Sequence, residues 1–199
     1  MRLRLRVIGL ALGLTLAGAG SAAAQVAWDS PMLMVPRGQT GLGLFLMEAA
    51  GGDLGFMGTW RAASGRGLGL RIGIAEDNTD DIAVFGGVDF ASPLTRASNE
   101  FPLDVDWVLG AGASVGDDFV LSIPAGITVG RTLDADGARF VPYATPRVIL
   151  DAFFGDGDDE LELDVAVDLG VELAFERAWA IRFGATLGDR DALAIGIVF

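Results

Sequence analysis

Apolar and polar residues alternate along most of the chain, which predicts β-strands with one apolar and one polar face. The segment 161–175 shows the pattern most clearly. Leucine, valine and phenylalanine occupy its odd-numbered positions, while acidic residues, alanine and glycine occupy the even-numbered ones. Successive side chains of a strand point to opposite faces, so one face of this strand is wholly apolar. A helix would distribute the same acids around its circumference.

The same alternation predicts ten strands, with eight as the alternative number. They span residues 40–48, 54–62, 67–75, 81–90, 103–114, 119–131, 139–153, 161–175, 178–187 and 191–199. Mean hydropathy is +0.46, yet no run of 18 apolar residues follows residue 24. A barrel whose strands each expose one face to lipid accounts for both facts. We therefore predict an all-β fold, a closed antiparallel up-and-down transmembrane β-barrel.

The first 24 residues have the pattern of a secretory signal peptide. Three arginines precede an apolar stretch, and the small residues Ala22 and Ala24 stand at the −3 and −1 positions of a cut after Ala24. An uncleaved membrane anchor is the alternative, but the apolar stretch is short for a span of about 20 residues. We predict a cleaved signal peptide over 1–24, an N-terminal lead-in over 25–38 and the barrel over 39–199.

Charge is distributed unevenly. The chain has 27 acidic residues against 14 arginines and no lysine, so it offers no basic surface for phosphate backbones and we expect no nucleic-acid partner. An even strand number puts both ends of the barrel on one side, which in outer-membrane barrels is the periplasm. Thirteen of the 27 acids then lie within or border the loops of the opposite side, against one arginine, whereas the four turns of the near side carry Arg66, Arg96, Arg139 and Arg177.

The chain ends in a strand that alternates apolar residues and finishes with phenylalanine. This ending, carried by Ile195, Ile197 and Phe199, resembles the assembly signal of bacterial outer-membrane proteins, although Ile197 stands where that signal has an aromatic. With the leader and the alternation, the chain resembles the small OmpA-, OmpX- or OmpW-type barrels. The resemblance implies the bacterial outer membrane as location, and membrane lipid and the outer-membrane barrel assembly machinery as partners.

The polar faces of the predicted strands place charged side chains in the lumen. Buried charges are costly unless they are paired, and arginine can bridge two carboxylates, so we predict a network that fills the lumen. It consists of Arg61, Arg71, Asp89, Asp104, Asp106, Arg147, Asp151, Glu162, Asp164, Asp168, Glu172 and Arg182. In this set, eight acids meet four arginines.

Composition also bears on chemistry. The chain has no histidine and no cysteine, which excludes Ser–His and Cys–His catalysis and zinc sites with nitrogen or sulfur ligands. We expect no catalytic residue, no cofactor and no metal site.

Three functions fit these predictions. The first is an outer-membrane barrel with a structural, envelope role. The second is a narrow, cation-preferring pore for small solutes, favoured by the surplus of four carboxylates. The third is a soluble, exported, lipocalin-like ligand-binding barrel, in which the apolar face of 161–175 would point inward.

Overall fold

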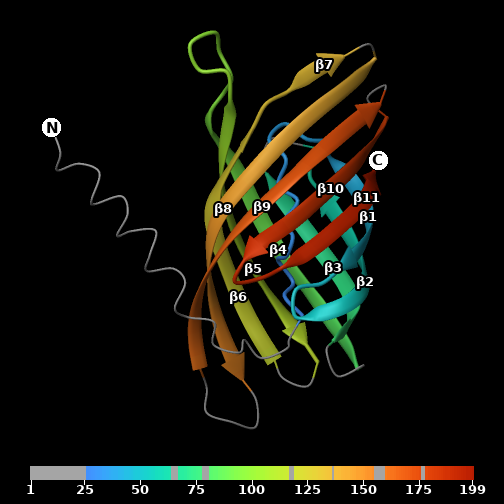
Figure 1. Cartoon of the computed structure of the whole chain (residues 1–199), viewed down its shortest axis with the longest axis vertical. Helices are drawn as coiled ribbons and strands as arrows, with labels where there is room; N and C mark the ends of the chain where they lie inside the picture. Colours follow the sequence, from blue (N-terminus) through green and yellow to red (C-terminus); the bar gives the residue numbers. More distant parts are fainter. Residues whose placement is uncertain are drawn as a thin grey trace, which may run out of the picture.

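The chain folds into a closed antiparallel β-barrel in the computed structural model (Figure 1). The structure describes residues 26–63, 67–77, 81–116, 119–135, 137–154, 160–175 and 178–199. Its strands are β1 (Gly41–Glu48), β2 (Gly52–Arg61), β3 (Leu68–Asp77), β4 (Ile82–Thr95), β5 (Asp104–Val115), β6 (Phe119–Gly130), β7 (Leu133–Ala135), β8 (Ala138–Phe154), β9 (Glu160–Phe175), β10 (Trp179–Gly188) and β11 (Ala192–Val198). None of the described residues forms a helix long and apolar enough to span a membrane.

Ten of these strands form the wall, which confirms the predicted fold and the larger of the two strand numbers. Neighbours in sequence pair with each other from β1 to β6 and from β8 to β11, and the pairings β1–β11 and β6–β8 complete the ring. The three-residue strand β7 was not predicted. It pairs only with the start of β8, so it extends one hairpin beyond the wall without adding a strand to the ring.

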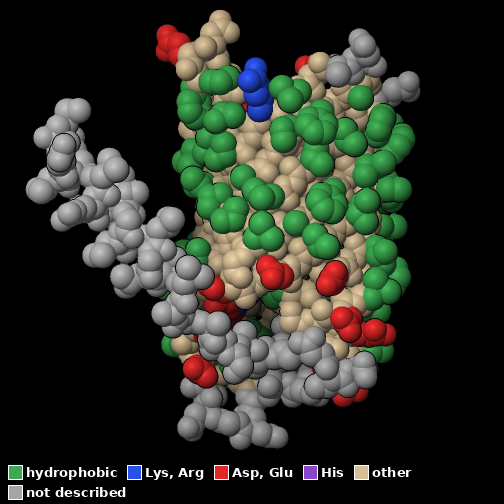
Figure 2. All heavy atoms as spheres, in the orientation of Figure 1, with side chains coloured by type: hydrophobic (Ala, Val, Ile, Leu, Met, Phe, Trp, Pro, Cys, Tyr) green, Lys and Arg blue, Asp and Glu red, His purple; other side chains and the backbone are tan. Residues whose placement is uncertain are grey.

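The outer face of the barrel is apolar (Figure 2). Side chains of the odd-numbered positions of β9 are among the most exposed of all, with Leu161 at 72% and Leu163 at 68%, and Ile72 of β3 is 66% exposed. Alternate positions of the same strands, such as Asp168 and Glu172, are fully buried. The lipocalin-like alternative required the opposite orientation of β9 and is therefore wrong.

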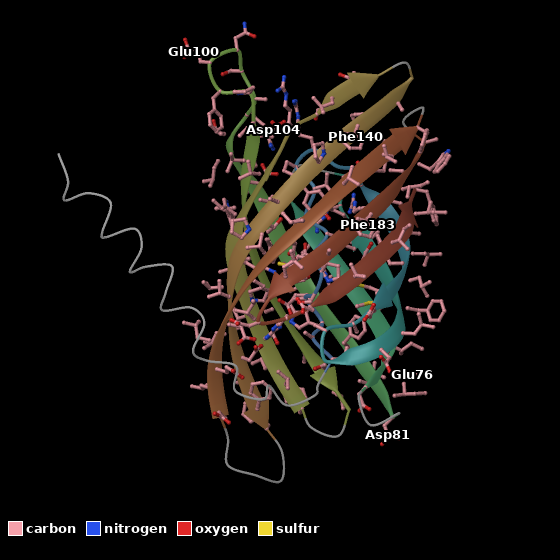
Figure 3. The ribbon with its side chains drawn as sticks, in the orientation of Figure 1. Glu76, Asp81, Glu100, Asp104, Phe140 and Phe183 are labelled. Carbon is pink, nitrogen blue, oxygen red and sulfur yellow. The ribbon has the colours of Figure 1, made fainter. Side chains whose placement is uncertain are left out.

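The two ends of the barrel differ in charge, and we call them the acidic end and the basic end. The acidic end carries the connections β1–β2, β3–β4, β5–β6, β8–β9 and β10–β11. The basic end carries the other connections, the start of β1 and the end of β11. Figure 3 shows Glu76 and Asp81 at the acidic end. The opposite end, where Figure 3 labels Glu100 and Asp104, also carries Arg96, Arg131 and Arg139 in or next to its connections.

The core lies inside the barrel and is asymmetric. Large apolar side chains of β1, β2 and β4, including Phe45, Met57 and Phe85, pack against Val26 and Trp28 of the N-terminal segment. The opposite wall, formed by β8, β9 and β10, presents buried arginines, carboxylates and threonines instead. The lumen is therefore richest in large apolar side chains along β1, β2 and β4 and richest in paired charges along β8, β9 and β10, with the N-terminal segment between them.

Candidate functional site

Residues 26–36, which we call the lumen segment, cross the interior from the acidic end to the basic end. At the acidic end, the amide of Ala27 donates to the carbonyl of Ala50. At the basic end, the carbonyl of Met34 accepts a hydrogen bond from Thr128 of β6 at 2.6 Å. The sequence suggested only a lead-in here. The structure shows that a ten-stranded ring, wider than the eight strands that side chains alone can fill, holds a stretch of its own chain.

Trp28 anchors the lumen segment in a flat slot made by glycines. Its indole is 1% exposed and donates to the carbonyl of Ser122 at 3.3 Å. A Cβ atom at Gly87, Gly110 or Gly112 would come against the ring. These inward glycines, which the alternation places on the polar face of β4 and β5, leave the space that the indole fills.

The backbone of the lumen segment forms no strand, so side chains of the wall satisfy its polar groups. Arg71 donates to the carbonyls of Pro31 at 3.1 Å and Met32 at 2.6 Å. Arg182 donates to the carbonyl of Leu33 at 3.2 Å. Three arginine–carbonyl hydrogen bonds thus hold the middle of the segment at a fixed position against the wall.

Charges are paired most densely around Asp29 of the lumen segment, which is fully buried. Its two carboxylate oxygens bind Arg147 of β8 and, at 2.6 Å, Arg190 of the β10–β11 loop. Arg147 also binds Asp168 at 3.0 Å, and Arg190 binds Asp164 at 3.0 Å. The segment therefore supplies the carboxylate that joins two arginines of different elements.

Two further carboxylates along the lumen are each shared by a pair of arginines. Arg61 and Arg71 bind the two oxygens of Asp89 at 2.5 and 3.2 Å. Glu172 binds Arg182, and its other oxygen lies 3.7 Å from Arg139. Both carboxylates are almost wholly buried, so each bridge satisfies charges that water cannot reach.

The network is balanced in charge. Among the described residues, the ion pairs join eight arginines, Arg37, Arg61, Arg71, Arg96, Arg139, Arg147, Arg182 and Arg190, to eight carboxylates, Asp29, Asp89, Asp104, Asp106, Asp151, Asp164, Asp168 and Glu172. Eleven of the twelve predicted members lie in it. Glu162 lies opposite Asp151 near the acidic end, is partly exposed and belongs to none of these pairs.

Five members were missed by sequence reasoning, and they change the predicted balance. Arg37, Arg96 and Arg190 lie in connections, Arg139 lies at the start of β8, and Asp29 lies in the lumen segment. Alternation identifies inward positions only within strands, so it gives no signal for the missed residues outside strands. Arg139 is different, because it begins the predicted strand 139–153 on the same face as Arg147, and alternation could have found it. Adding these four arginines and Asp29 to the predicted set reduces its surplus from four carboxylates to one, that of Glu162.

At the basic end the lumen opens into a cavity of about 230 Å³. Its wall includes Arg37 and the backbone of the turn after the lumen segment, Arg61 of β2, Arg96 of the β4–β5 connection, and Asp106 and Thr128 of β5 and β6. Arg96 donates to Asp106 at 2.7 Å. The cavity lies at the basic end of the charged network formed by the described residues, and four members of that network, Arg37, Arg61, Arg96 and Asp106, line it.

The remaining predicted residues lie elsewhere. Ile195, Ile197 and Phe199 are about half exposed on the outer face of the last strand and its end. Ile195 and Ile197 pair with Leu46 and Leu44 of β1, so they lie at the seam where the first and last strands meet. The predicted cleavage residues Ala22 and Ala24 lie outside the described residues.

Aromatic side chains lie near both ends of the barrel, as in membrane barrels. Phe175 and Trp179 stack across the β9–β10 turn of the basic end, with ring centroids 4.6 Å apart. Phe119 and Phe154 contact each other near the acidic end at 5.7 Å. The apolar outer surface between them is suited to contact with lipid.

No family model matches the chain, and no curated protein matches it. A solved structure from work described as "De novo design of transmembrane beta-barrels" is similar at 14% sequence identity and a TM-score of 0.36, covering 83% of this chain and 98% of that chain. A likeness at this level does not bear on function.

Proposed function

We propose that this protein is a bacterial outer-membrane β-barrel with a structural role in the envelope, and that its own N-terminal segment keeps its lumen closed. The observation that carries the proposal is the combination of an apolar outer face with an interior filled by chain and by paired charges. This combination is the reverse of a soluble barrel, whose polar face is outside.

Lipid is the medium that fits the outer face. Transferring one large apolar side chain from water to an apolar environment is favourable by about 1.5–3 kcal/mol, and exposed leucine, isoleucine, valine and phenylalanine cover every strand of the wall. A closed ring satisfies all strand hydrogen bonds without a free edge, which is the condition that a bilayer imposes on β-structure. A location in the outer membrane, assembly by the barrel assembly machinery through Ile195, Ile197 and Phe199, and the absence of catalysis complete the proposal.

A closed lumen is favoured over the cation-preferring pore by two features. The lumen segment occupies the interior, with Trp28, Asp29 and Met32 each at most 1% exposed. The eight arginines and eight carboxylates compensate one another, so the ion-paired set of the described lumen has no excess of carboxylates to attract cations. A narrow pore would need both the segment displaced and the pairs hydrated.

Two measurements test the proposal on the full chain produced with its leader. Cell fractionation should place the protein in the outer-membrane fraction, and its band should migrate differently in a gel with and without boiling. In planar bilayers the folded protein should produce no channel steps. A periplasmic protein that stays monodisperse without detergent would overturn the membrane assignment, and steady cation-selective conductance would overturn the closed lumen.

A further inference from the structure

The cavity at the basic end has a lining unlike the rest of the molecule. The chain has a formal net charge of −13, yet the cavity is lined by three arginines, Arg37, Arg61 and Arg96, and by a single carboxylate, that of Asp106. The arginines come from three separate connections or strand ends, so the fold, and not a local run of basic sequence, brings them together. We infer that this cavity binds a small oxyanion, such as phosphate or a small polycarboxylate.

Arg37 is the arginine that is most available to a ligand. Its nearest carboxylate oxygen belongs to Asp104 and is 4.0 Å away, and its side chain is 57% exposed. Guanidinium groups bind oxyanions through two parallel N–H donors. The planar fork of Arg37 therefore has donors to offer a ligand at the cavity wall.

The backbone at Arg37 supports a role for its side chain. The amide of Gly38 donates to the carbonyl of Val35 at 3.0 Å, which closes a turn with Pro36 and Arg37 at its centre. Arg37 has a φ of 56°, and turns of this kind favour glycine at that position. The turn therefore carries an arginine at a position where glycine is favoured, and the side chain of that arginine lines the cavity.

The other two arginines have partial partners and complete the site. Arg96 binds Asp106 through Nη1 at 2.7 Å, and the same nitrogen lies 3.8 Å from Asp104. Arg61 binds the carbonyl of Gly67 through Nη1 at 3.0 Å, and its Nη2 binds Asp89 at 2.5 Å and the sulfur of Met34 at 3.0 Å. Each guanidinium carries five N–H donors, so neither is saturated by these contacts. The lining itself presents three guanidinium groups and one carboxylate. Asp104 lies within 4.0 Å of Arg37 and Arg96, and Asp89 binds Arg61, so the cavity offers a small anion the exposed donors of Arg37 and the remaining donors of Arg96 and not a large net positive charge.

The size and place of the cavity narrow the ligand class. A volume of about 230 Å³ is below the roughly 300–1,000 Å³ of pockets for drug-sized molecules, so a small anion fits best. The cavity opens at the mouth of the lumen, away from the lipid-facing surface, which favours a free solute over a lipid headgroup. One wall belongs to the turn that follows the lumen segment, so the site exists only while that segment is in place.

Calorimetry on the folded mature chain in a nonionic detergent tests this inference. Inorganic phosphate and citrate are titrated separately, with sodium chloride at matched ionic strength as the reference. We expect saturable binding of one anion per barrel for at least one of the two probes. Arg37→Gln should weaken binding at least tenfold, because it removes the guanidinium fork that is most exposed to the ligand.

Arg131→Gln is the matched control, since Arg131 is exposed at the same end but does not line the cavity. Its affinity should equal that of the unchanged protein. Heat-modifiable migration reports that each variant is folded. If neither probe binds better than chloride, or if Arg131→Gln weakens binding as much as Arg37→Gln, the inference fails. The experiment does not depend on membrane location, so it stands apart from the test of the proposed function.

Discussion

Single inward residues of the wall determine whether the lumen segment fits inside the barrel, and Gly87 shows this most clearly. A Cβ at this position would overlap the indole of Trp28, whereas a Cβ at Gly58 of β2, on the outer face, has its nearest neighbour at 3.9 Å. Overfilling a packed interior costs about 1–3 kcal/mol. We expect Gly87→Ala to lower the free energy of unfolding in denaturant by that amount, while Gly58→Ala changes it by less than about 0.5 kcal/mol. Equal effects of the two variants would contradict the inserted position of Trp28.

Among substitutions of the lumen arginines, loss of Arg147 should lower the free energy of unfolding most. Its side chain is fully buried between Asp29 and Asp168, and removing one partner of a buried pair leaves an uncompensated charge at a cost of about 3–5 kcal/mol. Arg147→Met should therefore lower the free energy of unfolding by several kcal/mol in urea titrations of the detergent-folded protein. Arg131→Met, which replaces an exposed arginine, serves as the control and should be close to neutral. An Arg147→Met variant as stable as its control would show that the pairs are not essential.

At this scale the sequence could predict strand positions but not partners outside strands. Asp168, Glu172 and Arg182 follow from alternation, because a polar residue every second position on an otherwise apolar strand has to face the lumen. Asp29 and Arg190 do not follow, because no periodicity tells which way a side chain in an irregular segment points. Asp29 and Arg190 are 161 residues apart in sequence. They come together only because the barrel closes, and a local sequence pattern does not predict that contact.

Among the elements, the lumen segment explains how a ten-stranded ring avoids an empty interior. Residues 26–36 are mostly apolar yet do not alternate, so the pattern assigned them to no strand. An apolar segment without strand or helix still has to be buried, and the lumen is the interior that this fold provides. The strands themselves were predictable because one face of each is buried and the other exposed, which fixes a period of two.

Deleting residues 26–36 should turn the closed barrel into a conducting one. The deletion removes Trp28 and Asp29 together with the carbonyls that bind Arg71 and Arg182, so water should enter to hydrate the exposed charges. We expect channel steps in planar bilayers for the deleted chain and none for the full mature chain. The boiled and unboiled gel bands show independently that the deleted chain still folds. A folded but silent deletion variant would mean that side chains of the wall alone close the lumen.

Trp28→Ala tests the packing of the lumen segment without shortening the chain. The substitution empties the glycine slot formed by Gly87, Gly110 and Gly112, and truncation of a buried tryptophan costs about 3–5 kcal/mol. The free energy of unfolding should fall by that amount, whereas Trp179→Ala, at an outer position that is 40% exposed, should cost clearly less in detergent. A Trp28→Ala variant that is no less stable than Trp179→Ala would place the indole outside the packed lumen.

For the whole molecule, the unequal ends imply a direction in the membrane. The barrel starts with β1 and ends with β11 at the basic end (Figure 1). Both chain ends of an even-numbered outer-membrane barrel are expected on the periplasmic side. The acidic end, with Glu76 and Asp81 (Figure 3), would then face outward.

Single cysteines can report this direction without any background, because the chain contains no cysteine of its own. Asp81→Cys should react with a membrane-impermeant maleimide on intact cells. Glu100→Cys, at the opposite end, should react only after the outer membrane is permeabilised. Both residues are exposed, so differences in burial do not confound the comparison. The reverse pattern would mean that the basic end, and with it the oxyanion cavity, faces the medium, and labelling of both positions on intact cells would contradict a spanning barrel.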